Sequence, residues 1–204
     1  MKIYDISQEV FSAQVYPGDP APTRTRLCSM EEGDVYNLTA FSMCAHNGTH
    51  IDAPAHFLRE GDTVEQIPLS RVVGQAFVVV HEGDVTAADA RRMLEVAGNA
   101  SPAAAKRLLI KGTATVTEEA AGVFATAGLV LLGNESQSVG PMEAPMAVHQ
   151  CLLSVGAVLL EGIRLEEVPE GEYFLCAAPL CLGRAEGAPC RALLVDPTAP
   201  DGQS

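Results

Sequence analysis

Residues 46–57 of this 204-residue chain read HNGTHIDAPAHF, and the rest of the sequence is interpreted around this stretch. Three of the chain's five histidines, His46, His50 and His56, lie in it together with Asp52. Histidine is the commonest protein ligand for metals such as zinc, and a carboxylate is its usual companion. The stretch therefore predicts the first half of a metal site.

The segment is predicted to be extended rather than helical. An HxxxH pair can share one face of a helix, but Gly48, Pro54 and the β-branched residues between them disfavour a helix. In an extended chain His50 and Asp52 point to the same face, with Cα atoms roughly 6–7 Å apart. The chain must bend to bring His46 beside them, and Gly48 permits that bend. The alternative is that these histidines are exposed on a loop without a role. Three histidines and an aspartate on the same face of the segment favour a metal site instead.

The overall composition excludes several classes of function. Hydrophobic residues make up 48% of the chain, and its formal net charge of -13 repels phosphate backbones and anionic membranes. We therefore expect no nucleic-acid partner and no membrane partner. The N-terminus lacks the apolar core of a signal peptide, and the apolar runs are too short to span a bilayer. These features predict a soluble, cytoplasmic protein.

Chain length predicts one domain over residues 1–204, with a loose tail over residues 197–204. The six cysteines include no CxxC pair and are expected to be free thiols. Cys44 could reach a metal bound near His46, although the histidines and carboxylates suffice without it.

Strand patterns alternate with helix patterns, which predicts an α/β domain. Helices are expected over residues 86–97 and 117–127, each starting at a threonine N-cap, and over residues 143–155. A polar loop over residues 134–141 precedes the third helix. Strands are expected over residues 2–8, 38–45, 75–81, 107–110, 129–132, 157–160, 173–177 and 191–195.

The spacing His46-x3-His50-x-Asp52-x3-His56-Phe57 resembles the signature of the cyclase family of metal-dependent hydrolases, which includes bacterial kynurenine formamidases and isatin hydrolases. The resemblance extends over about residues 2 to 196. Tyr16-Pro17-Gly18-Asp19 looks like the family's N-terminal loop, Ser136-Gln137-Ser138 lies in its polar loop, and His149 with Glu161 twelve residues later looks like its second metal-binding segment. The resemblance implies a swivelling β/β/α-type fold, with a mixed sheet core flanked by helices, and a homo-oligomer, either a dimer or a tetramer.

The resemblance also implies a role for each matching residue. His46, His50 and Asp52 would hold a first metal, and Asp52 would bridge to a second. His149 would bind the second metal and Glu161 would bridge both. His56 would transfer protons, and Tyr16 would contact the substrate. The cofactors would be two divalent metal ions, zinc first and manganese as the alternative.

The implied chemistry is hydrolysis of a small amide. Two divalent cations against two carboxylates leave enough positive charge to hold a hydroxide near neutral pH, and the second cation can polarise the carbonyl. An amide nitrogen is a poor leaving group, so it needs a proton, and His56, with an ordinary pKa of about 6.5, suits that duty. The leading prediction is an arylformamidase of tryptophan catabolism that converts N-formylkynurenine to kynurenine and formate.

Two alternatives stay open. Tyr16 stands where the formamidases typically carry tryptophan, and the chain has no tryptophan, although tyrosine can still stack on an aryl ring. A hydrolase of a cyclic amide, imide or lactone such as isatin is therefore the second hypothesis. A non-catalytic metal-binding relative is the third, but it would have lost the proton donor or a bridging carboxylate. Asn134-Glu135 also stands where an aspartate is commoner in the family.

Overall fold

A nine-stranded mixed sheet forms the centre of the structure, a computed structural model that describes residues 1–198. The parallel strands β5, β7, β9 and β10 lie in the middle of the sheet, and antiparallel strands extend it on both sides. In spatial order the strands are β1 (Lys2–Asp5), β13 (Leu193–Asp196), β11 (Gly171–Cys176), β5 (Val73–Val80), β7 (Arg107–Lys111), β9 (Leu131–Asn134), β10 (Val158–Glu161), β4 (His50–Asp52) and β12 (Gly187–Pro189).

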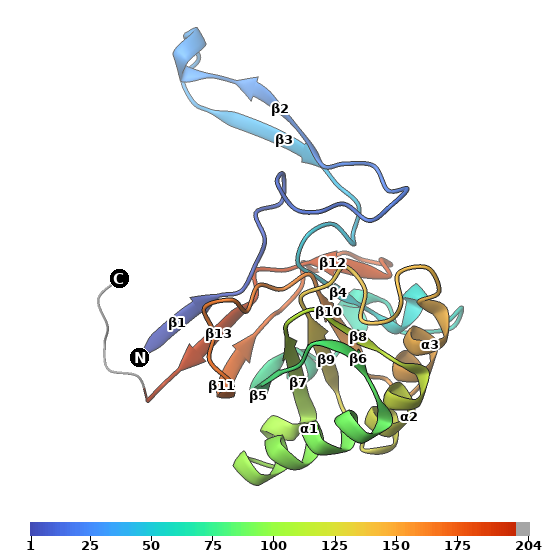
Figure 1. The fold of residues 1–204 in the computed structure, drawn as a ribbon. Helices are drawn as coiled ribbons and strands as arrows, with labels where there is room; N and C mark the ends of the chain where they lie inside the picture. The colour runs from blue at the N-terminus through green and yellow to red at the C-terminus, as the bar shows by residue number, and fades with distance from the viewer. Residues whose placement is uncertain (199–204) are drawn as a thin grey trace.

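Three helices connect the parallel strands and pack together on one side of the sheet (Figure 1). Helix α1 (Ala87–Ala100) links β5 to β7, α2 (Glu118–Thr126) links β7 to β9, and α3 (Met146–Ser154) links β9 to β10. The threonine caps predicted from the sequence are confirmed, because the side chains of Thr86 and Thr117 accept hydrogen bonds from the backbone amides of Asp89 and Ala120. The α/β class and the mixed sheet flanked by helices are likewise confirmed.

Alternating side chains of the parallel strands feed two separate cores. Phe77 and Val79 of β5 face the helices, whereas Ala76 and Val78 face a second core on the other side of the sheet. Residues of the outer strands β4, β11 and β13 complete this second core. A strand buried on both faces needs a continuous apolar run, which explains the sequence of β5.

The strand predicted over residues 38–45 ends at Ser42 and lies outside the central sheet. β2 (Thr23–Cys28) and β3 (Leu38–Ser42) pair only with each other among the described residues, and they project from the body as an arm (Figure 1). β2 was not predicted, because its sequence, TRTRLC, lacks the apolar alternation of a half-buried strand. We call residues 23–42 the arm.

Short elements complete the chain. β6 (Gly83–Val85) and β8 (Ala114–Val116) form a small parallel pair. The 3-10 helices are η1 (Met30–Glu32), η2 (Pro54–His56), η3 (Val64–Gln66), η4 (Leu69–Arg71) and η5 (Ala104–Lys106). All six cysteines are free thiols. Within residues 1–198 no helix has both the length and the apolar character that crossing a membrane requires. Of the predicted loose tail, residues 199–204 lie outside the described part of the chain.

Candidate active site

The pairing of β4 with β10 brings together two segments that are far apart in the sequence. In this antiparallel register His50 lies opposite Glu161, and Asp52 lies opposite Leu159. Opposed residues point to the same side of a sheet, as do residues two apart on one strand, so His50, Asp52 and Glu161 converge. His149, on α3 just before β10, has its Nε2 atom 3.2 Å from Glu161 Oε1. The cluster lies at the carboxyl end of β10, where α/β sheets commonly bind ligands.

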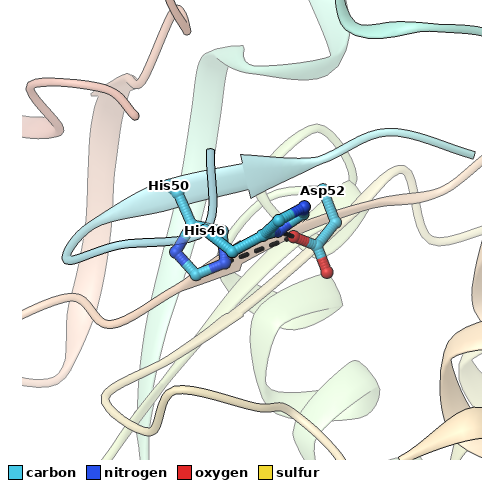
Figure 2. Close-up of side chains that lie close together, drawn as sticks. All are labelled: His46, His50 and Asp52. Carbon is cyan, nitrogen blue, oxygen red and sulfur yellow. Dashed lines mark hydrogen bonds and ion pairs between the residues drawn. The ribbon is translucent and has the colours of Figure 1, made fainter. Parts of the chain in front are cut away.

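His46 reaches the cluster through the bend predicted at Gly48, whose φ angle is +66°. Its Nδ1 atom lies 2.9 Å from Asp52 Oδ1, a contact drawn in Figure 2. Only His50–Asp52 is a strand, and the predicted bend at Gly48 is present, but the extended conformation expected toward His56 is wrong. Pro54 starts the 3-10 helix η2, which carries the His56 ring over His46 with ring centroids 4.0 Å apart.

The donor atoms form two groups suited to metal ions. One group is His46, His50 and Asp52; the other is Asp52, His149 and Glu161. Four neighbouring donor pairs are 3.2–3.5 Å apart. Four ligands arranged tetrahedrally at typical zinc distances are about 3.3 Å from one another, so the spacing fits. Cys44 belongs to neither group among the described residues.

Two of the histidine rings, those of His50 and His149, are oriented as metal ligands. His50 Nδ1 donates to the Gly48 carbonyl at 2.9 Å, and His149 Nδ1 donates to the Pro145 carbonyl at 2.8 Å. Such hydrogen bonds orient the ring and leave Nε2 free to bind a metal. In both residues Nε2 is the atom that faces the carboxylates.

The electrostatics of the cluster also favour a cation. Burial by itself lowers the pKa of His50 and of His149, but hydrogen bonds to Asp52 and Glu161 outweigh it and raise each pKa to about 10. Burial raises the pKa of Asp52, but its close contacts with the imidazoles of His149, His46 and His50 hold that pKa well below its usual range. Asp52 Oδ2 is buried without a hydrogen-bond partner. A divalent cation would supply the positive charge that these buried carboxylates require.

A cavity of about 250 Å³ opens above this cluster. Tyr16 lies in its wall, where its hydroxyl donates to the Met142 carbonyl at 2.7 Å. His56 also lines the cavity, and burial lowers its pKa. Of the site residues that the sequence predicted, all except Asp52 line this cavity, and Asp52 contacts His46 and His50 beneath it. The full lining is Tyr16, Asp19, His46, His50, His56, Phe57, Gln137, Ser138, Pro145, His149 and Glu161.

Sequence reasoning gave no role to several residues near the site. Asp19, Gln137 and Ser138 belong to the segments that carried the family resemblance, and that is the signal that could have identified them. Glu186, whose Oε1 atom lies 3.3 Å from His46 Nε2, had no such signal, because it follows β11 in a loop without a recognisable motif.

The Asn134-Glu135 pair has a structural role. Asn134 Nδ2 donates to the carbonyls of Ala114 and Ser138. The Glu135 carboxylate accepts hydrogen bonds from the backbone amides of Gly112 and Leu165 at 2.7 and 2.8 Å. This pair therefore fixes the loop after β9.

Comparison with known proteins agrees with this architecture. The Cyclase family model, described as "Putative cyclase", matches residues 4–141. A kynurenine formamidase of Salinibacter ruber (strain DSM 13855 / M31) is 36% identical, over 98% of this chain and 100% of the relative. A solved structure of a potential metal-dependent hydrolase with cyclase activity superposes with a TM-score of 0.79 at 29% identity, covering 96% of this chain and 99% of the other.

Isatin hydrolase A from Labrenzia aggregata, solved with bound benzyl benzoate, superposes with a TM-score of 0.80 over 95% of this chain and 93% of its own. At 19% identity this likeness shows a shared fold. The family model spans more than half of the chain, and a relative aligned over its full length is 36% identical. On this evidence the chain belongs to the cyclase family of metal-dependent hydrolases.

Proposed function

We propose that this protein is an arylformamidase that hydrolyses N-formylkynurenine to kynurenine and formate. The observation that carries the proposal is the meeting of two metal-donor groups and a separate histidine, His56, around one cavity. The similarity to a kynurenine formamidase along the whole chain supports the choice of substrate.

The site is proposed to hold two divalent ions, zinc first and manganese as the alternative. Asp52 would contribute one oxygen to each group, because its Oδ1 faces His46 and His50 while its Oδ2 faces His149. Glu161 does the same, with Oε2 3.5 Å from His50 and Oε1 3.2 Å from His149. Divalent ions bound in such a site supply Lewis acidity, which polarises a carbonyl and lowers the pKa of water.

His56 is proposed to move the proton that amide cleavage requires. The lowered pKa of the partly buried His56 ring means that it is neutral near pH 7, so a ring nitrogen can accept a proton from the attacking water and then deliver it to the departing amide nitrogen. Stacking on His46 and an edge contact with Phe57 fix the ring. Tyr16, anchored through its hydroxyl, offers an aromatic face to an aryl substrate.

The test measures formate released from N-formylkynurenine by zinc- or manganese-loaded protein, with metal content determined on the same sample. We expect His56→Asn to lower kcat by about 10²- to 10⁴-fold without loss of metal. His81→Asn is the matched control, because the His81 ring lies outside the cavity and faces the Asp84 carbonyl. Metal binding without turnover, or full activity of His56→Asn, would refute the proposal. Isatin is assayed in parallel. If it is turned over faster than N-formylkynurenine, the proposed function changes to hydrolysis of a cyclic amide.

We further propose that the protein is a homo-oligomer, a dimer or a tetramer, in which the arm contacts a second copy. An isolated two-stranded hairpin is marginally stable in water, yet Leu27, Val35, Tyr36 and Phe41 of the arm are 56–90% exposed. A groove at the base of the arm is lined by apolar residues that include Phe11. In a two-fold symmetric dimer the arm of each chain could lie in the groove of the other, and both surfaces are present on this chain.

Light scattering after size-exclusion chromatography tests this part. We expect the wild-type protein to exceed the mass of one chain, and Val35→Asp with Tyr36→Asp to shift it toward the monomer. Leu69→Asp is the control, since Leu69 is 64% exposed but lies outside the arm. A monomeric wild-type protein would contradict the proposal.

A further inference from the structure

Three of the residues with a buried side-chain atom that lacks a hydrogen-bond partner, His46, Gln137 and Ser138, line the cavity. Among the described residues such atoms belong to His46, Asp52, Asn134, Gln137 and Ser138. Buried polar groups in native proteins nearly always have partners, so each exception calls for an explanation. The candidate metal donors explain the atoms on His46 and Asp52, but the loop after β9 requires another explanation.

Gln137 is the most conspicuous residue of that loop. Its side chain is 6% exposed, and both Nε2 and Oε1 are buried without a partner. It lines the cavity together with His56, His149 and Glu161. By contrast, the Asn134 amide group donates to two backbone carbonyls, so the loop already has a structural amide.

The backbone fixes the position of Gln137 beside the metal-donor cluster. The next residue but one, Val139, donates its backbone N–H to Glu161 Oε1 at 2.7 Å. Gly162 donates its N–H to the Ser136 carbonyl at 2.7 Å. Gly162 also leaves room for the side chain, because a Cβ atom there would lie 2.8 Å from Gln137 Nε2. The Gln137 amide therefore sits against the walls of the site.

We propose that Gln137 is a specificity-determining residue that recognises the amide group of the substrate. Its side-chain oxygen accepts a hydrogen bond from the substrate N–H, which an ester of the same shape lacks. A site built to hydrogen-bond a substrate N–H discriminates strongly against an analogue without it, since the polar group of the site is then left unpaired. This inference rests on the proposed amide hydrolysis and goes beyond it by predicting selectivity for amides over esters.

The experiment compares formanilide with phenyl formate, which share the formyl and phenyl groups and differ in N–H against O. Gln137→Met keeps the approximate length of the side chain and removes both polar atoms. We expect kcat/KM for formanilide to fall about 10- to 100-fold, while kcat/KM for phenyl formate, corrected for spontaneous hydrolysis, changes less than about threefold. Gln75→Met is the matched control, because Gln75 is exposed on β5 away from the cavity.

Thermal melting separates recognition from a structural role. Gln137→Met removes two buried atoms that have no protein partner, so its Tm should be unchanged or higher and its metal content normal. Equal losses of kcat/KM on both substrates, no loss on formanilide, or a lower Tm with less bound metal would overturn the inference.

Failure of the proposed function has a different signature. If wild-type protein turns over neither compound, amide hydrolysis is refuted. Calorimetric binding of the two compounds then tests whether Gln137 recognises the N–H group. A preference for formanilide that Gln137→Met abolishes would still support recognition of the N–H. Equal binding of the amide and the ester by wild-type protein would overturn it.

Discussion

Gly187 on β12 is predicted to be indispensable for the position of His46. A Cβ atom at residue 187 would lie 2.6 Å from His46 Cε1 and 2.8 Å from the Ile51 carbonyl oxygen. The Ile51 carbonyl belongs to β4, which pairs with β12, so it has little freedom to move. In Gly187→Ala the His46 ring must therefore shift by about 0.9 Å to restore an ordinary carbon contact of about 3.5 Å.

A shift of this size is enough to break the hydrogen bond between His46 and Asp52. His46 Nδ1 lies 2.9 Å from Asp52 Oδ1, and a displacement near 0.9 Å takes the pair beyond the usual hydrogen-bonding range. Overpacking of this kind typically costs about 1–3 kcal/mol of stability. Loss of a group that orients a metal site typically weakens metal binding by about 10- to 100-fold.

Isothermal titration of the metal-free protein with zinc, together with a urea unfolding curve, tests this prediction. Gly183→Ala is the control, because a Cβ atom at residue 183 meets nothing within 4 Å. We expect Gly183→Ala to bind zinc as the wild type does, while Gly187→Ala binds it more weakly. Unchanged zinc affinity in Gly187→Ala would refute the steric argument.

Three further predictions concern the metal, its coupling to pH, and the fold. The pKa values of about 10 for His50 and His149 mean that each ring carries an additional proton at pH 7, and a metal must displace it. Metal affinity measured by calorimetry should therefore rise with pH, about tenfold per pH unit for each proton released. An affinity that does not change with pH would contradict this prediction. Removing metal with a chelator should lower the free energy of unfolding, and zinc at 100 times its Kd should restore about 2.7 kcal/mol; identical unfolding curves would argue against metal binding. Thr86→Ala should cost about 1 kcal/mol in urea unfolding because Thr86 caps α1, whereas Thr113→Ala, at an exposed position, should cost little; equal effects would deny the cap.

The fold illustrates where sequence patterns succeed. The threonine caps of α1 and α2 and the β-branched run of β5 are local signals, and each appears in the structure within a few residues of its predicted range. The arm was missed because an exposed hairpin needs no apolar alternation. Its strand β3 was predicted, but its partner was not, since strand pairing depends on segments that the pattern of one strand does not reveal.

The sequence by itself determined the chemical character of the site. His46, His50, Asp52 and His56 lie within eleven residues, so their spacing and the bend at Gly48 could be read directly from the chain. Only the tertiary structure decided which atoms meet. The register of β4 against β10 sets His50 opposite Glu161, and this register depends on how the whole sheet packs. Gln137 likewise became visible only through burial without a partner, a property that arises when distant segments enclose a side chain.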